Sequence, residues 1–372
     1  MTTPLVTRKP LGSFDLWETM EKGRGCVSFT LELTARCNNN CRHCYINLPA
    51  GDTCAREKEL SAEQIFAIAD EAVRLGAIWC TITGGEPLLR PDFAGIYVGL
   101  KRKGLLVSVL TNAALINESH VELFRRYPPR DIEVTVYGVT RETYERVTRC
   151  PGSFDACMRG LDLLHNAGIK VRLKAMAIRS NFHEAEQIAA FSRARTKDYY
   201  RFDPLLHLRM DRDPARNAEI RQERLSPEEI VALEKADPER SESLKKNCHE
   251  YISDGPGDPG SDILITCGAG TSSFVISPDG KFRLCESLNH PDCVYDLANG
   301  SIEDAWHRFI PKVRAMTSCR KEYRETCHVC PIINLCMWCP AHADLETGMP
   351  DGQTEYFCRV AHARAAALGY KK

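Results

Sequence analysis

The stretch SFTLELTARCNNNCRHCY, residues 28–45, joins a strand-like run to a loop that carries three cysteines. The run Ser28–Thr34 predicts the first strand of the fold. Cys37, Cys41 and Cys44 follow it with the spacing C-x3-C-x2-C. Three thiolates on one short loop can ligate three irons of a cubane cluster and leave the fourth iron open. An open iron can bind a small chelating molecule, so the loop indicates catalysis rather than electron storage alone. The alternatives are a zinc loop or buried thiols.

Strand-like and helix-like segments alternate from residue 28 to about residue 206. The helix over Ser61–Leu75 begins with capping-box spacing between Ser61 and Gln64 and stops at Gly76. The further predicted strands are Ala77–Thr83, Leu105–Leu110, Asp131–Tyr137, Ile169–Ala177 and Tyr199–Leu206. The further predicted helices lie around Asp92–Lys103, Glu118–Arg126, Phe154–Asn166 and His183–Arg195. Six βα units in series predict an α/β fold whose parallel strands curl into a partial (β/α)6 barrel.

The second predicted strand ends in Gly84-Gly85-Glu86-Pro87. Two glycines allow a ligand to approach the backbone closely. Exposed carbonyls and the Glu86 carboxylate could accept hydrogen bonds from an ammonium group. A glycine pair alone is typical of a turn. Because ligands bind at the C-terminal ends of barrel strands, this pair and the cysteine loop on the neighbouring strand together predict a binding site.

Cys37, Cys41, Cys44 and the Gly84–Pro87 motif resemble the radical S-adenosylmethionine (SAM) superfamily over about residues 28 to 206. The resemblance implies that SAM binds the open iron of a [4Fe–4S] cluster through its amino and carboxylate groups. One electron then splits the sulfonium, and the 5′-deoxyadenosyl radical takes a hydrogen from a substrate. The family also places polar side chains near the SAM ribose at the end of the fourth strand. Here Thr135 and Tyr137 occupy that end, with a tyrosine in place of the commoner acid.

Three other residues are candidates at this end of the fold. Arg149, which precedes the segment PGSF, could meet the SAM carboxylate, or it could be a solvated arginine. Asp203 and His207 lie at or just beyond the end of the last predicted strand, where a substrate should sit. Either could take a proton from a substrate radical or orient it. The alternative is a loop cap and a surface imidazole.

A second cysteine set lies near the C-terminus. Its pattern is Cys267-x12-Gly280-x4-Cys285, then Cys327-x2-Cys330-x5-Cys336-x2-Cys339, then Cys358. Such sets suit either zinc or iron–sulfur. The strand-like Phe274–Ile276 and the turn Ser277–Gly280 predict a hairpin that brings Cys267 and Cys285 together.

The order of these seven cysteines resembles the SPASM extension of radical SAM enzymes, which carries two auxiliary [4Fe–4S] clusters. By this resemblance Cys327, Cys330, Cys336 and Cys358 hold one cluster. Cys267, Cys285 and Cys339 hold the other, whose fourth ligand is Cys248 or an open site. The family commonly has three residues between the fifth and sixth cysteines, and this chain has two, Met337 and Trp338. The remaining cysteines are expected to be structural thiols: Cys26, Cys54, Cys80, Cys150, Cys157, Cys293 and Cys319.

These patterns divide the chain into four predicted parts. Residues 1–27 form an N-terminal extension, 28–206 the radical SAM core, 207–262 a charged helical linker and 263–372 the SPASM domain. The expected reaction is oxidation or cross-linking of a peptide or protein side chain. The alternative is a small-molecule reaction such as decarboxylation of tetrapyrrole side chains. A rival of another class is a non-catalytic zinc or electron-transfer protein.

Bulk properties limit location and partners. The 372 residues have a formal net charge of −1, so nucleic acid and anionic membranes are not expected partners. No long apolar run or signal-peptide core is present, which predicts a cytoplasmic protein without a membrane span. The 18 cysteines then indicate metal binding rather than disulfides. We expect an external electron donor such as flavodoxin or ferredoxin. Because residues 1–27 are too short for a leader-peptide-binding domain, a separate protein could supply one.

Overall fold

The structure is a computed structural model that describes residues 25–247, 252 and 262–370. At its centre the described residues form a nine-stranded sheet with the order β11-β10-β9-β1-β4-β5-β6-β7-β8. Six strands are mutually parallel and follow chain order: β1 Ser28–Glu32, β4 Trp79–Thr83, β5 Leu106–Thr111, β6 Asp131–Thr135, β7 Arg172–Met176 and β8 Arg201–Asp203. This arrangement confirms the predicted α/β fold.

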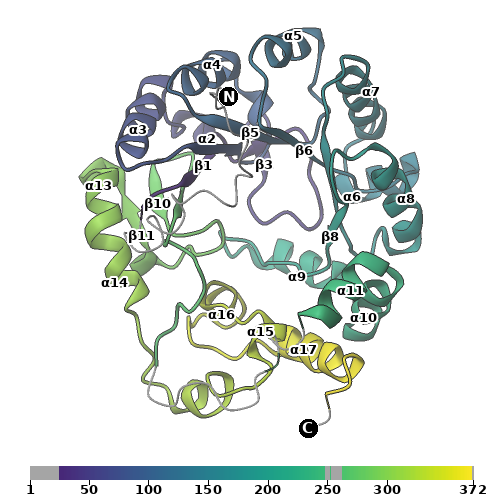
Figure 1. Ribbon diagram of the computed structural model, residues 1–372, viewed down its shortest axis with the longest axis vertical. Coiled ribbons are helices and arrows are strands. Elements are labelled where there is room, and N and C mark those ends of the chain that lie inside the picture. Colours follow the sequence, from purple (N-terminus) through teal and green to yellow (C-terminus); the bar gives the residue numbers. More distant parts are fainter. Residues whose placement is uncertain (1–24, 248–251, 253–261, 371–372) are drawn as a thin grey trace, which may run out of the picture.

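Helices cover the outer face of these strands (Figure 1). They are α3 Ala62–Arg74, α4 Phe93–Arg102, α5 Glu118–Arg126, α7 Ser153–Asn166 and α8 Ala185–Arg195. The capping box of Ser61 and Gln64 is present at the start of α3. The sequence patterns missed four short elements: α2 Thr53–Glu57, α6 Arg141–Thr148, β2 Arg36–Cys37 and β3 Leu48–Pro49. These segments are only two to eight residues long, too short for a hydrophobic period to repeat.

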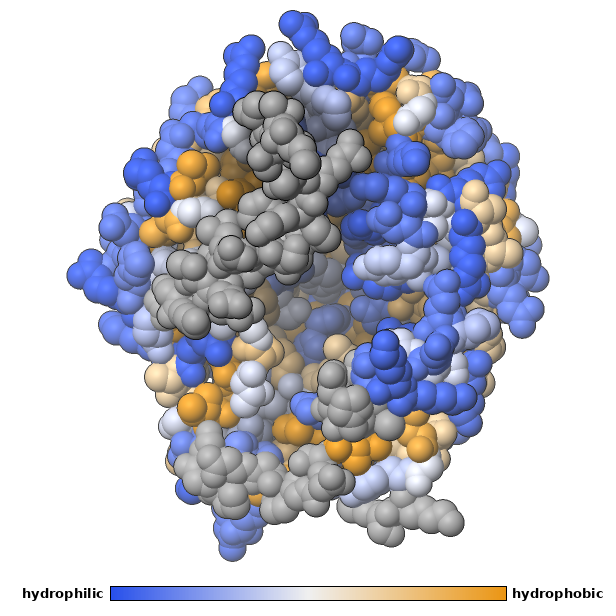
Figure 2. Space-filling model, in the orientation of Figure 1, coloured by the Kyte–Doolittle hydropathy of each residue, from blue (hydrophilic) through white to orange (hydrophobic). Residues whose placement is uncertain are grey.

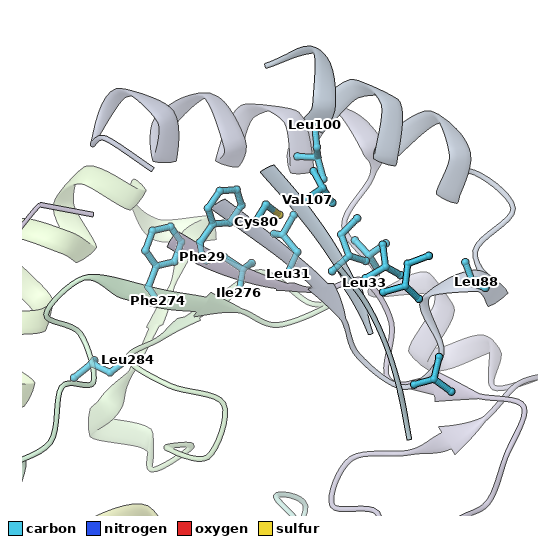
Figure 3. Close-up of a cluster of buried hydrophobic side chains, with 14 of the residues drawn as sticks. Phe29, Leu31, Leu33, Cys80, Leu88, Leu100, Val107, Phe274, Ile276 and Leu284 are labelled. Atoms are coloured by element: carbon cyan, nitrogen blue, oxygen red, sulfur yellow. The ribbon is translucent and has the colours of Figure 1, made fainter. Parts of the chain in front are cut away.

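Alternate residues of β1 point into the layer between the sheet and the helices. Phe29, Leu31 and Leu33 are almost fully buried there (Figure 3). The opposite face of β1, with Thr30 and Glu32, turns toward the inside of the barrel. Burying one such apolar side chain contributes about 1.5–3 kcal/mol, so the register of β1 is firmly set. The cysteine loop that follows therefore starts from a fixed point.

The C-terminal part of the chain joins the same sheet through a hairpin. Strand β9, Ser273–Ile276, is parallel to β1, and β10, Lys281–Arg283, returns antiparallel to β9. Strand β11, Val294–Asp296, completes this edge. The predicted hairpin is thus present. The sequence did not predict that this hairpin extends the barrel sheet. The stacking of Phe274 on Phe29, at 5.6 Å between ring centroids, accounts for the extension.

Further helices follow β8 and β11. The first three are α9 Pro214–Glu223, α10 Pro227–Ala236 and α11 Pro238–Lys246. The C-terminal ones are α13 Ile302–Asp304, α14 Ile310–Arg314, α15 Ile333–Cys336, α16 Pro340–Thr347 and α17 Glu355–Ala367. Short 3₁₀ turns span Pro87–Leu89, Phe182–Glu184, Pro291–Cys293 and Leu297–Asn299, and π-helical turns span Ala305–Phe309 and Tyr323–Cys327.

A buried ion pair joins the two groups of helices, because Arg364 of α17 contacts Glu234 of α10 at 2.7 Å. Within the described residues, no helix is long and apolar enough to cross a membrane. The predicted boundaries between the four parts of the chain stay predictions.

Candidate active site

The cysteine loop is tied to the barrel on both sides. The guanidinium of Arg36 lies 2.7 Å from the carboxylate of Glu59, and both side chains are buried. Within the loop, the backbone N–H groups of Asn40 and Arg42 donate to carbonyls at the end of α6 at 2.8 and 3.0 Å. Helix α6 was absent from the predicted fold, yet it holds one side of the loop in place.

The loop opens onto a cavity of about 290 Å³ at the C-terminal ends of the parallel strands. The predicted residues that line it are Cys37, Cys41, Cys44, Gly84, Gly85, Thr135, Tyr137, Asp203 and His207. They come from β1, β4, β6 and β8 and the loops that follow these strands. The face shown in Figure 2 is hollowed near its centre, with hydrophilic side chains around the hollow. One cavity thus brings together most of the residues that the sequence singled out.

The two glycines are required by the backbone of the preceding strand as well as by the cavity. Gly84 has φ +132°, and a Cβ there would lie 2.2 Å from the carbonyl oxygen of Thr34. A Cβ at Gly85 would lie 2.2 Å from the carbonyl oxygen of Arg36. The expectation that the glycines serve ligand approach is therefore incomplete. Any side chain at either position would push away the strand that carries the cysteine loop.

Glu86 lies behind the cavity wall and is fully buried. Its carboxylate accepts hydrogen bonds from the hydroxyl of Thr111 at 2.7 Å and the backbone N–H groups of Asn112 and Leu88 at 2.8 and 3.1 Å. Burial raises the pKa of Glu86 to about 7, against the opposing effect of these three donors. Its oxygens are already engaged, so the predicted contact with an ammonium group stays a prediction. Pro87 starts the 3₁₀ turn that follows.

Arg149 is also placed beside the loop rather than in the cavity lining. Its Nε donates to the carbonyl of Asn40 at 2.9 Å, and its Nη1 lies 2.9 Å from Glu219. Its Nη2 is buried without a partner among the described residues. The direct contact with SAM that the resemblance implies stays a prediction. The observed contacts instead brace the loop from outside.

The thiols of the cysteine loop must lose their protons when a cluster binds to them. Burial raises the pKa of Cys37 to about 12, and it also raises the pKa of Cys41 well above its usual value. Thiolates are the form that ligates iron, so metal binding here must release protons. Within the described residues, no three His, Cys, Asp or Glu side chains converge tightly enough to hold one metal ion. In a [4Fe–4S] cluster each thiolate ligates a different iron, which is compatible with thiols that stand apart.

Asp203 and His207 form the cavity wall that faces the C-terminal part of the chain. One Asp203 oxygen accepts from the N–H of Leu205 at 3.0 Å, as in a loop cap. His207 is not the surface imidazole of the alternative interpretation, because burial lowers its pKa and its ring meets that of His342 at 4.1 Å. Its Nδ1 lies 3.4 Å from the hydroxyl of Ser287. The imidazole thus connects the cavity to the segments that carry the second cysteine set.

The second cysteine set falls into the two groups that the resemblance implies. Cys327, Cys330, Cys336 and Cys358 line one small cavity of about 30 Å³ together with Trp338. Burial raises the pKa of Cys285 and Cys339, and the nearby thiol of Cys267 raises both further, so these three cysteines lie close together. The candidate ligand Cys248 lies outside the described residues. The structure forms no disulfide among the cysteines that it describes.

The cysteines expected to be structural differ among themselves. Cys26, Cys80, Cys157 and Cys293 are buried among apolar side chains, as that role requires. Cys54 and Cys319 are exposed, because one starts a short surface helix and the other lies in a loop. For these two the packing role is not supported.

Sequence reasoning missed two residues of the loop's surroundings. Asn112 follows β5 directly and donates from Nδ2 to Asn38 at 2.8 Å and toward the sulfur of Cys37 at 3.8 Å. Arg209 donates to the carbonyl of Cys44 and to the side chain of Asn47. A signal for Asn112 was available, since a polar residue directly after a barrel strand lies at the ligand-binding end.

Comparison with known proteins agrees with this geometry. The family model "Radical SAM superfamily" matches residues 31–191, which span the cysteine loop and strands β4 to β7. The chain carries a radical SAM domain. Members of this family are enzymes that use SAM and a [4Fe–4S] cluster, so the family and the cofactors predicted from the cysteine loop are confirmed.

Among curated relatives, the chain is 27% identical over 325 residues to the antilisterial bacteriocin subtilosin biosynthesis protein AlbA of Bacillus subtilis. That alignment covers 83% of this chain and 66% of AlbA. This chain is also 31% identical over 157 residues to an AdoMet-dependent heme synthase of Methanosarcina barkeri. That alignment covers 41% of this chain and 43% of the heme synthase. The chain therefore spans less than two thirds of the length of either relative.

Among solved structures, the fold is similar to that of Streptococcus suis SuiB bound to its precursor peptide SuiA. The TM-score is 0.67 and the sequence identity 13%, with 96% of this chain and 84% of SuiB covered. At this identity the similarity concerns the fold. It extends beyond the radical SAM domain into the part of the chain that holds the second cysteine set.

Proposed function

We propose that this radical SAM enzyme abstracts a hydrogen atom from a side chain of a peptide or protein and so oxidises or cross-links it. The observation that carries the proposal is that Cys37, Cys41 and Cys44 open onto the same cavity as Gly84 and Gly85. When bound, SAM and a [4Fe–4S] cluster with one open iron supply a 5′-deoxyadenosyl radical.

The chain's own residues would bind and orient these groups. The three loop thiols would ligate the cluster, and the backbone around Gly84 and Gly85 would form the wall for the SAM methionine moiety. Thr135, on the cavity wall at the end of β6, would meet the ribose. Asp203 and His207 would face the substrate. The two C-terminal cysteine groups would hold auxiliary clusters that take up the electron of an oxidation.

The charged side chains of the cavity lining favour a peptide substrate over a tetrapyrrole substrate. Among the described residues, the one lysine or arginine in the cavity lining is Lys174, and it is paired with Glu133 at 2.8 Å. Arg209 is paired with Asp211, and Arg201 is exposed outside the lining. The propionates of a tetrapyrrole would meet no unpaired cation among these residues.

The similar proteins also favour a peptide substrate. The match to AlbA, a protein of bacteriocin biosynthesis, extends over most of the chain, whereas the match to the heme synthase covers 41% of it. The SuiB fold was seen with a precursor peptide bound. A tetrapyrrole substrate is the second candidate, favoured by the higher identity of the heme synthase. An external electron donor and a separate leader-binding protein stay predictions.

Deuterium transfer can test the proposal. Reduced, reconstituted enzyme is incubated with SAM and either a perdeuterated peptide pool or coproporphyrin deuterated in its propionates. Mass spectrometry of 5′-deoxyadenosine then reports the source of the abstracted hydrogen. We expect deuterium from the peptide pool and none in the Cys41→Ala control. Transfer from the porphyrin alone would favour the second candidate.

A further inference from the structure

We propose that Asn112 and Tyr137 donate hydrogen bonds to two of the three loop sulfurs and thereby raise the reduction potential of the cluster that the loop holds. The inference rests on the proposed function, because it requires a cluster on Cys37, Cys41 and Cys44. Neither residue belongs to the cysteine or glycine motif. Asn112 comes from the end of β5 and Tyr137 from just beyond β6.

Asn112 acts on the sulfur of Cys37. Its Nδ2 lies 3.8 Å from that sulfur, within reach of an N–H to sulfur hydrogen bond, and the backbone N–H of Asn39 donates to the same sulfur at 3.4 Å. The same amide nitrogen also donates to the side-chain oxygen of Asn38 at 2.8 Å. The side-chain oxygen of Asn112 accepts from the N–H of Ala114 at 2.9 Å, which fixes which way the amide points.

Glu86 of the glycine motif positions Asn112. It accepts the backbone N–H of Asn112 at 2.8 Å and the hydroxyl of Thr111 at 2.7 Å. The residue that sequence patterns assign to SAM thus also holds a donor against Cys37. Glu86 is therefore a positioning residue for the loop, acting through Asn112.

Tyr137 acts on the sulfur of Cys41. Tyr137 and Cys41 line the same cavity, and the hydroxyl lies close enough to the thiol to interact with it. The phenol ring is held between His43, at 5.2 Å between ring centroids, and Tyr144, at 5.6 Å. A phenol carries one O–H group, which can donate to a thiolate.

Hydrogen bonds to ligand sulfurs shift the potential because reduction adds an electron to the cluster. The added negative charge lies partly on sulfur, so a donor stabilises the reduced form more than the oxidised form. Each donor therefore makes reduction easier. In a buried site such bonds are electrostatically stronger than they would be in water.

The test is a redox titration of anaerobically reconstituted full-length protein. Electron paramagnetic resonance follows reduction, and the signal that changes on adding SAM identifies the loop cluster among the others. Tyr137→Phe removes the hydroxyl and keeps the ring. Asn112→Asp keeps the oxygen that accepts from Ala114 but replaces the donor with an acceptor. Tyr144→Phe is the matched control, since the buried hydroxyl of Tyr144 has no hydrogen-bond partner among the described residues.

We expect a more negative midpoint potential in Tyr137→Phe, a larger negative shift in Asn112→Asp, and no shift in Tyr144→Phe. An unchanged potential in Tyr137→Phe at full iron content would overturn the role of its hydroxyl. If Tyr137→Phe fails to retain iron, the midpoint potential of Asn112→Asp is used instead. An unchanged potential in that variant at full iron content would overturn the role of the Asn112 amide. A wild-type protein without any SAM-dependent signal would contradict the proposed function itself, which is a separate outcome.

Discussion

The two cysteine-rich regions are built in different ways. The loop of Cys37, Cys41 and Cys44 follows a strand whose neighbours on both sides are parallel strands of the sheet. In the C-terminal group, Cys327 lies on a π-helical turn, Cys330 in the turn that follows, Cys336 on a four-residue helix and Cys358 in the first turn of α17. The barrel can therefore position the start of the loop by sheet register, and contacts with helix α6 and Arg149 hold the rest of the loop. The C-terminal group lies on short helical segments and turns, and a metal would supply much of its order.

The sharpest contrast between the regions is chemical. Cys41→Ala should abolish formation of 5′-deoxyadenosine from SAM, because the loss of one loop thiolate destroys the cluster with the open iron. Cys336→Ala should leave slow cleavage of SAM without substrate intact. Chromatography of the quenched reaction measures both. With three clusters, about 12 irons are expected per chain, and each variant should retain about eight. Equal cleavage rates in wild type and Cys41→Ala would contradict the assignment of the loop.

Removing iron should separate the regions structurally. Anaerobic chelation is expected to loosen the cysteine-rich residues 323–358 while strands β1 and β4–β7 keep their protection, because those strands bury their apolar side chains without metal. Hydrogen exchange with mass spectrometry, before and after chelation, compares the two. The peptides that contain the buried residues Ile82 of β4 and Val109 of β5 serve as internal references. Equal loss of protection in both regions would show that the barrel also depends on its cluster.

The third prediction concerns the contact between the C-terminal hairpin and the barrel strand β1. Arg283 of β10 and Glu32 of β1 form an ion pair in which both side chains are almost fully buried. Arg283→Met would leave the carboxylate without its partner, at a cost of about 3–5 kcal/mol. Burial already raises the pKa of Glu32 to about 7. Without Arg283 the carboxyl binds a proton more readily, so we expect the loss of stability to be larger at pH 8 than at pH 5.

Denaturant unfolding at the two pH values measures this cost. The control is the double variant Glu32→Gln with Arg283→Met, in which no buried charge remains and the pH dependence should disappear. A single variant as stable as wild type at pH 8 would mean that the pair does not hold the junction.

The sequence by itself determined the parallel barrel, the cysteine loop and the family. These follow from local patterns: alternating strands and helices, a capping box at Ser61, and three cysteines at fixed spacing directly after a strand. It also determined the hairpin at Ser277–Gly280, because turn residues stand between two strand-like runs. Even the grouping of the seven C-terminal cysteines followed from their order, through the resemblance to a known family.

Only the tertiary structure decided which side chains surround the cluster loop. Asn112 and Tyr137 reach the sulfurs because parallel pairing aligns the ends of β5 and β6 with the end of β1. Glu86 is buried behind the wall for the same reason, since the neighbouring strand offers it three donors. The contact of β9 with β1 joins residues more than 240 positions apart. Such contacts depend on sheet order, and no pattern within a short window of sequence contains that order.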